Sequence, residues 1–188
     1  MSGSSDDRLP VTVAVVLWPE EDDVCVSCRF SYRDVSVEEC IDIVRSVPVD
    51  ARAAVDAIPP ADRGRRPRTG TWSAAEYVCH LRDVYIAYTI RLHRARTEDE
   101  PVVEPMLNDL RARRFRYAER STGAVLDELA ITVVGFCEEA AKPRPQDWDR
   151  TVQRLPGERR TARWLLRQAA HEGRHHVADL RALGPRTP

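Results

Sequence analysis

The most constraining feature of this 188-residue chain is the change of pattern at Ser36. Strand-like segments occur before it, and helical periodicity dominates after it. Capping boxes mark two helix starts, Ser36 with Glu39 and Ser73 with Glu76, because their side chains can satisfy free backbone N–H groups. Helices of this kind must bury their apolar faces against one another. The sequence therefore predicts an all-α four-helix bundle.

Helix breakers and caps set the bounds of the expected elements. Pro48 should break or kink the first helix, because proline lacks a backbone N–H. A shorter helical stretch is expected over residues 106–119, and a connector over residues 143–160. The four long helices are expected over residues 37–58, 74–97, 122–142 and 161–184.

The residues before the bundle form a separate N-terminal extension in this interpretation. The extension covers residues 1–35 and the bundle domain residues 36–184. Two segments of the extension, Val11 to Trp18 and Asp23 to Tyr32, are rich in β-forming residues and are separated by a polar turn. They predict a small β-hairpin.

Composition excludes several classes of function. The net charge of −1 gives no global attraction to nucleic acid or to an anionic membrane. No apolar run approaches the length of a bilayer span. The first ten residues lack the basic region and apolar core of a secretory signal. A cytoplasmic protein without nucleic-acid or membrane partners is therefore expected.

The pair Cys25-x-x-Cys28 has the spacing of half a zinc-ribbon site. The chain contains no second pair of this spacing to complete a ribbon. A free thiol pair, a redox pair and a structural metal site therefore stay open. The total of five cysteines is odd, so a disulfide framework is not expected.

The densest group of metal-ligating residues is "HEGRHH", His171 to His176, in the last expected helix. At roughly 100° per residue, Glu172 and His176 lie together on the flank of the apolar stripe. His171 and His175 lie almost opposite that stripe, where they are expected to be exposed or to support the ligands. Either pair could contact one ion, since side chains four residues apart meet on a helix.

His80 occupies the equivalent flank position on the second long helix. Flank positions of neighbouring helices face one another, so His80, Glu172 and His176 can converge. Two imidazoles and one carboxylate leave a coordination position open, as in a catalytic divalent site, with Zn²⁺ favoured and Ni²⁺ or Mn²⁺ as alternatives. His171 and His175 are the alternative ligands. A hydrogen-bonded Glu–His pair without metal is the competing interpretation.

Supporting roles are expected for three further residues. Asp83, Asp179 and His175 are candidates to hold the ligand imidazoles in one tautomer by hydrogen bonds. The chain has no Gly-rich phosphate loop and no serine nucleophile motif, so no residue is assigned as a catalytic nucleophile, acid or base.

Four motifs in this order resemble the DinB-like superfamily of four-helix metalloproteins, and they span residues 37–183: "TWSAAEYVCHL", "RYAE", "DWDR" and "HEGRHHVADL". In many members the last helix carries H-x-x-x-H, and here Glu172 stands at the first of those histidines. This departure resembles the mycothiol-dependent maleylpyruvate isomerase branch, whose ligands are His, Glu and His. The resemblance implies His80, Glu172 and His176 as ligands, a four-helix bundle and a homodimer.

The resemblance also implies a function. Related members are thiol S-transferases that use mycothiol or bacillithiol, or metal-dependent hydrolases. The implied activity joins a low-molecular-weight thiol of the mycothiol type to a small-molecule electrophile, for S-transfer or isomerisation. Hydrolysis by a metal-bound water and a non-catalytic interaction or stress module are the alternatives. The start "CVSCRFSY" resembles a CxxCGF opening of some members, with Arg29 in place of glycine, which argues against a zinc knuckle there.

Overall fold

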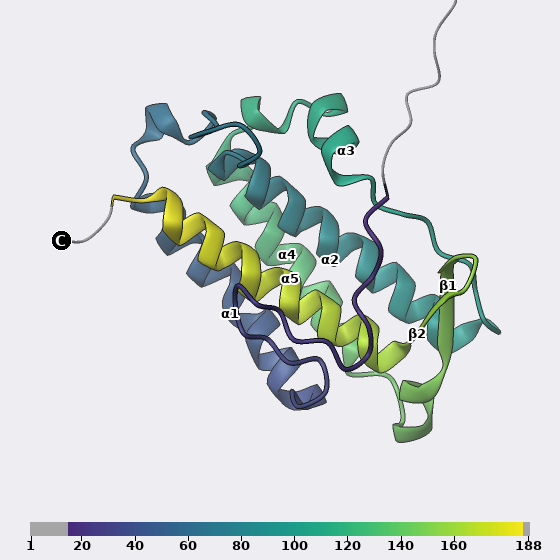
Figure 1. Cartoon of the computed structure of the whole chain (residues 1–188). Helices are drawn as coiled ribbons and strands as arrows, with labels where there is room; N and C mark the ends of the chain where they lie inside the picture. The colour runs from purple at the N-terminus through teal and green to yellow at the C-terminus, as the bar shows by residue number, and fades with distance from the viewer. Residues whose placement is uncertain (1–14, 186–188) are drawn as a thin grey trace, which may run out of the picture.

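A computed structural model describes residues 15–185 of the chain. Four long helices lie side by side (Figure 1), and they are α1 (Val37–Asp56), α2 (Ala74–Thr97), α4 (Thr122–Ala140) and α5 (Ala162–Leu183). Helix α1 packs on α4 and α5, and α2 packs on the same two helices. The predicted four-helix bundle is confirmed. Among the described residues, no helix has the length and apolarity needed to cross a membrane.

The helix starts follow the predicted caps. Both capping boxes form, so the hydroxyl of Ser36 accepts from the Glu39 backbone N–H and the hydroxyl of Ser73 accepts from that of Glu76. Pro48, in contrast, does not end the first helix, because α1 runs through it. Buried side chains on both sides of the proline hold the two halves of α1 against the bundle, which offsets the missing hydrogen bond.

The expected connector over residues 143–160 is wrong, because it contains regular structure. Strands β1 (Thr151–Leu155) and β2 (Glu158–Thr161) form an antiparallel hairpin in which Thr151 pairs with Thr161. Gly157 in the turn has φ +79°, a conformation that favours glycine. The dipeptide Pro156-Gly157 was the available turn signal. The shorter elements are 3₁₀ turns at Pro60–Asp62, Tyr117–Glu119 and Pro145–Asp149, and helix α3 (Asn108–Arg114).

The predicted N-terminal hairpin is not formed by the described residues. The first part of its first segment, residues 11–14, lies outside them, and residues 15–35 contain a single antiparallel bridge, Val24 to Ser31. This N-terminal segment runs across α5 instead (Figure 1). Tyr32 is fully buried, and its ring stacks on that of Trp164 with centroids 5.9 Å apart. One face of α5 is therefore covered by the segment and not by a helix.

Gly173 lies where α5 approaches Tyr85 of α2 and Val47 of α1. A Cβ atom at this position would overlap the Tyr85 hydroxyl and come within 2.6 Å of Val47 Cγ2. The helix that carries Glu172 and His176 can therefore pack this closely only with glycine here.

We expect Gly173→Ala to lower the free energy of unfolding by about 1–3 kcal/mol, because it overpacks the core. Gly135 of α4 is the matched control, since nothing lies within 4 Å of an added Cβ. Gly135→Ala should raise stability by about 0.5–1 kcal/mol, because alanine favours helix more than glycine does. Urea denaturation of both variants measures the difference, and similar effects would contradict the close approach.

Candidate metal centre

Three side chains from two helices converge between α2 and α5. The ligand atoms of His80, Glu172 and His176 all lie within 4.8 Å of one another. Glu172 Oε2 is 3.0 Å from His80 Nε2 and 3.2 Å from His176 Nε2. These are the three residues that the two helical wheels place on facing flanks.

The electrostatics of the cluster follow from the buried carboxylate. Burial alone would raise the pKa of Glu172, but hydrogen bonds from His176 and His80 hold it well below its usual value. Burial lowers the pKa of His80, which keeps that imidazole neutral. Burial also opposes charge on His176, yet hydrogen bonds to Asp179 and Glu172 raise its pKa to about 9. Glu172 is thus an anion facing one neutral and one cationic imidazole.

Neighbouring polar groups fix the orientation of these side chains. His176 Nδ1 donates to Asp179 Oδ2 at 2.8 Å, which turns Nε2 toward Glu172. Gln168 Nε2 donates to Glu172 Oε1 at 2.6 Å, which leaves Oε2 for the imidazoles. The Trp72 ring packs edge-on against His80, with centroids 5.1 Å apart. Sequence reasoning proposed Asp179 for such a role and missed Gln168.

The donor set fits a divalent cation. In a tetrahedral zinc site with bonds of about 2.0–2.1 Å, oxygen and nitrogen ligands lie roughly 3.3 Å apart, close to the distances seen here. A carboxylate paired to the far nitrogen of a ligand imidazole, as Asp179 is to His176, is the usual support in such sites. With three protein ligands, a coordination position stays open, which suits catalysis more than structure.

A cavity of about 450 Å³ adjoins this cluster, and His80 and Glu172 form part of its wall. Its other walls include Trp18 from the N-terminal segment and Tyr88 and Arg91 from α2. Arg91 is only 5% exposed, and its guanidinium lies 4.7 Å from the Tyr88 ring centroid. Within residues 15–185, no carboxylate pairs with Arg91, whose hydrogen bond goes to the Glu104 carbonyl.

His171 and His175 are not exposed in the way the wheel suggested. They face the N-terminal segment, where their ligand atoms and those of Cys25 and Cys28 all lie within 4.8 Å of one another. Burial lowers the pKa of His171 to about 4. The wheel could not anticipate this, because it considers only helix neighbours. The chain has no second CxxC pair, and the side chains that lie beside Cys25 and Cys28 are these two histidines.

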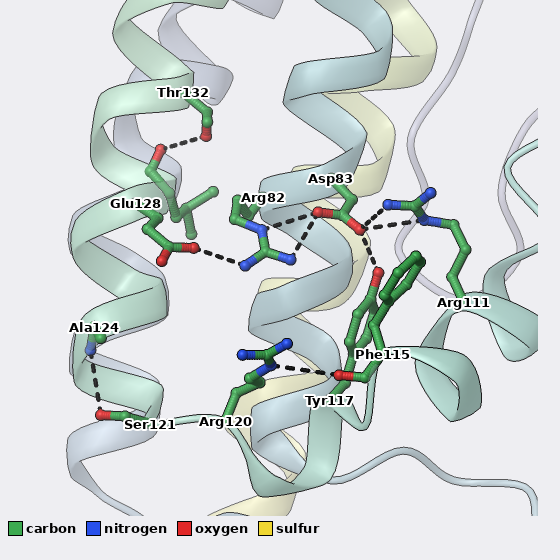
Figure 2. Close-up of polar contacts among 11 residues, drawn as sticks. Arg82, Asp83, Arg111, Phe115, Tyr117, Arg120, Ser121, Ala124, Glu128 and Thr132 are labelled. Carbon is green, nitrogen blue, oxygen red and sulfur yellow. Dashed lines mark hydrogen bonds and ion pairs between the residues drawn. The ribbon is translucent and has the colours of Figure 1, made fainter.

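Asp83, expected to orient a ligand imidazole, has different partners. Its carboxylate accepts hydrogen bonds from Arg82, Arg111 and the Tyr117 hydroxyl, as Figure 2 shows. Burial would raise the pKa of Asp83, but these donors lower it below its usual value. Asp83 therefore does not hold a ligand imidazole. It lies three residues after His80, but its oxygens point toward α3 and the turn at Tyr117–Glu119.

Residues 44–180 match the DinB superfamily, so the chain belongs to that family. Two relatives from Geobacillus carry the name "Putative metal-dependent hydrolase". The protein of G. kaustophilus is 35% identical over 69 residues, which cover 37% of this chain and 39% of the relative. That of G. thermodenitrificans is 32% identical over 74 residues, or 39% and 42%. The matches thus span about two fifths of each relative.

Solved structures share the fold. YfiT from Bacillus subtilis, described as an unusual four-helix bundle, superposes with a TM-score of 0.74 at 19% identity, over 80% of this chain and 89% of YfiT. A mycothiol-dependent maleylpyruvate isomerase gives a TM-score of 0.62 at 19% identity, over 78% of this chain and 61% of the isomerase. At these identities the likeness establishes the bundle architecture.

We expect Asp83→Asn to lower the free energy of unfolding at pH 7 by about 1–3 kcal/mol, because it removes a buried carboxylate that accepts hydrogen bonds from two half-buried arginines. The folded-state pKa of Asp83 is depressed, so its stabilisation is fully present above the unfolded value of about 3.9 and is lost as the pH falls through the folded value. The difference in the free energy of unfolding between wild type and variant should therefore shrink from pH 6 to pH 3 in urea titrations. A constant difference would contradict the ionised state of Asp83.

Proposed function

We propose that this protein is a metal-dependent enzyme that binds a low-molecular-weight thiol beside His80, Glu172 and His176 and joins it to a small electrophile. The observation that carries this proposal is the open-sided ligand set on the wall of a 450 Å³ cavity. The ion would displace the proton from His176 Nε2, so that two neutral imidazoles and one carboxylate would hold it. One of these two reaction classes, isomerisation, is the one named for the mycothiol-dependent structural relative.

A divalent cation here would supply Lewis acidity that lowers the pKa of a thiol in the open position. Glu172 contributes one negative charge, so the ion and its three ligands carry a net charge of +1. A thiol, with a pKa near 8.5, needs a much smaller shift to ionise than water, with a pKa of about 15.7. A thiol in the open position would therefore ionise more readily than a water there.

Protein residues prepare the rest of the pocket. Asp179 and Gln168 keep His176 and Glu172 pointing at the open position. Arg91 presents a buried guanidinium to the same cavity without a carboxylate partner in residues 15–185. Because a buried charge is stabilised by an opposite charge, we assign Arg91 to the carboxylate of an anionic electrophile or thiol.

Metal-dependent hydrolysis is the second candidate, because the two Geobacillus relatives carry that name. The same ligand set is used in zinc hydrolases with a water in the open position. The two functions differ in whether turnover requires a thiol.

We expect cobalt-loaded protein to bind mycothiol saturably, with new thiolate-to-cobalt absorption in the near ultraviolet. Glu172→Gln and the double variant His80→Ala/His176→Ala should lose this response, because they remove ligands of the open site. Glu138→Gln, at an exposed glutamate of α4, is the matched control and should retain it.

Two results would contradict the thiol proposal. One is a cobalt spectrum that no thiol changes. The other is turnover of ester or amide substrates in the absence of thiol, which would support hydrolysis at the same centre.

We expect Arg91→Met to weaken binding of a small dicarboxylate such as maleate by at least about tenfold, as for the loss of a hydrogen bond to a charged group. Arg113 is the control, since it lines the same cavity but is exposed. Solvent compensates an exposed charge, so Arg113→Met should change the affinity less than about threefold. Titration calorimetry on the metal-loaded protein measures both. Equal losses would argue against a buried anion contact at Arg91.

A further inference from the structure

We propose a second metal site, in which Cys25, Cys28, His171 and His175 bind a structural zinc ion that fastens the N-terminal segment to α5. The four ligand atoms all lie within 4.8 Å of one another, and all four residues are half-buried. Cys25 Sγ lies 3.5 Å from His175 Nδ1. In a tetrahedral site with Zn–S of about 2.3 Å and Zn–N of about 2.0–2.1 Å, neighbouring ligand atoms are roughly 3.3–3.8 Å apart.

Hydrogen bonding leaves one nitrogen of His171 available for a metal. The Glu172 carboxylate can only accept, so Gln168 donates its amide N–H₂ to it and turns its carbonyl toward Tyr32. The Tyr32 hydroxyl donates to the Gln168 carbonyl. Since that proton is used, the Tyr32 oxygen accepts from His171 Nδ1–H at 2.8 Å. His171 Nε2 therefore carries a lone pair. This atom is buried and has no hydrogen-bond partner within the described part of the chain.

His175 also has one ring nitrogen directed toward the cysteines and the other toward a carboxylate. Its Nδ1 faces Cys25, and its Nε2 lies 3.6 Å from Asp179 Oδ2. The same carboxylate oxygen accepts from His176 Nδ1. Asp179 thus stands behind one imidazole of each cluster, the position in which a carboxylate supports a metal-bound histidine.

The cysteine turn has the backbone that places both sulfurs on one side. The Arg29 backbone N–H donates to the Cys25 carbonyl at 2.8 Å, and the Cys25 N–H donates to the Phe30 carbonyl at 2.9 Å. Arg29 adopts φ +57°, the left-handed conformation that glycine would otherwise provide. The missing glycine therefore does not prevent a knuckle-like turn.

Zinc balances the charge of this site. Binding displaces one proton from each thiol to solvent, and two thiolates neutralise the two charges of the ion while both imidazoles stay neutral. All four positions are filled by protein atoms, the arrangement of a structural and not a catalytic zinc. The ion would join residues more than a hundred positions apart in sequence. It would thereby hold the segment whose Trp18 lines the cavity beside the first cluster.

The experiment uses the full chain, purified with zinc and without chelator. We expect two zinc ions per chain by elemental analysis, one for each cluster. Cys25→Ser/Cys28→Ser should lose one ion and the thiolate-to-cobalt absorption of the cobalt-substituted protein. Cys137→Ser is the matched control at another half-buried cysteine and should keep both. His80→Ala/His176→Ala should lose one ion but retain that absorption.

The outcomes separate this proposal from the proposed function. One ion that is lost in the cysteine variant and kept in His80→Ala/His176→Ala supports the second site alone. A single ion that is kept in the cysteine variant and lost in His80→Ala/His176→Ala overturns the second site. Cobalt-substituted wild type provides a test that needs no variant, because absence of thiolate-to-cobalt absorption also overturns it. A Cys25–Cys28 disulfide found by mass spectrometry in the zinc-purified protein would assign the pair to redox chemistry instead.

Discussion

The carboxylate of Glu172 organises the polar interior of this bundle. A charge buried between helices is unfavourable unless it is paired, and Glu172 meets this requirement with His80, His176 and Gln168. Because a carboxylate only accepts hydrogen bonds, it dictates the direction of every bond that leads away from it. The hydrogen-bond chain runs from Glu172 through Gln168 and Tyr32 to His171 on an adjacent face of α5, where it leaves Nε2 unprotonated.

Two clusters of candidate metal ligands can share one helix because their residue pairs are offset by a single residue. Glu172 and His176 face α2, whereas His171 and His175, rotated by about 100°, face the N-terminal segment. The close approach of α5 at Gly173 sets how near the first pair comes to His80. Asp179 contacts an imidazole of each pair. A change of ligation in one cluster is therefore expected to change the hydrogen bonding of the imidazole in the other.

The helices were predictable because their determinants are local. The boxes at Ser36 and Ser73 and the end at Gly184 act within a few residues, and the apolar periodicity acts within a turn or two. At Pro48 the helix does not break, because tertiary packing outweighs one lost hydrogen bond. The hairpin at residues 151–161 was missed although Pro156-Gly157 marks its turn. The aromatic residues before Ser36 suggested strands, but they serve instead to cover α5.

The sequence alone determined the bundle and the three residues that meet between α2 and α5, because helical spacing settles which side chains share a face. It could not determine the partners of faces that the bundle leaves open. Only the tertiary structure decided that Cys25 and Cys28 meet His171 and His175, that Asp83 turns away from His80, and that Arg91 is buried beside the cavity. These contacts join segments distant in sequence, and no local pattern encodes which loop packs on which helix face.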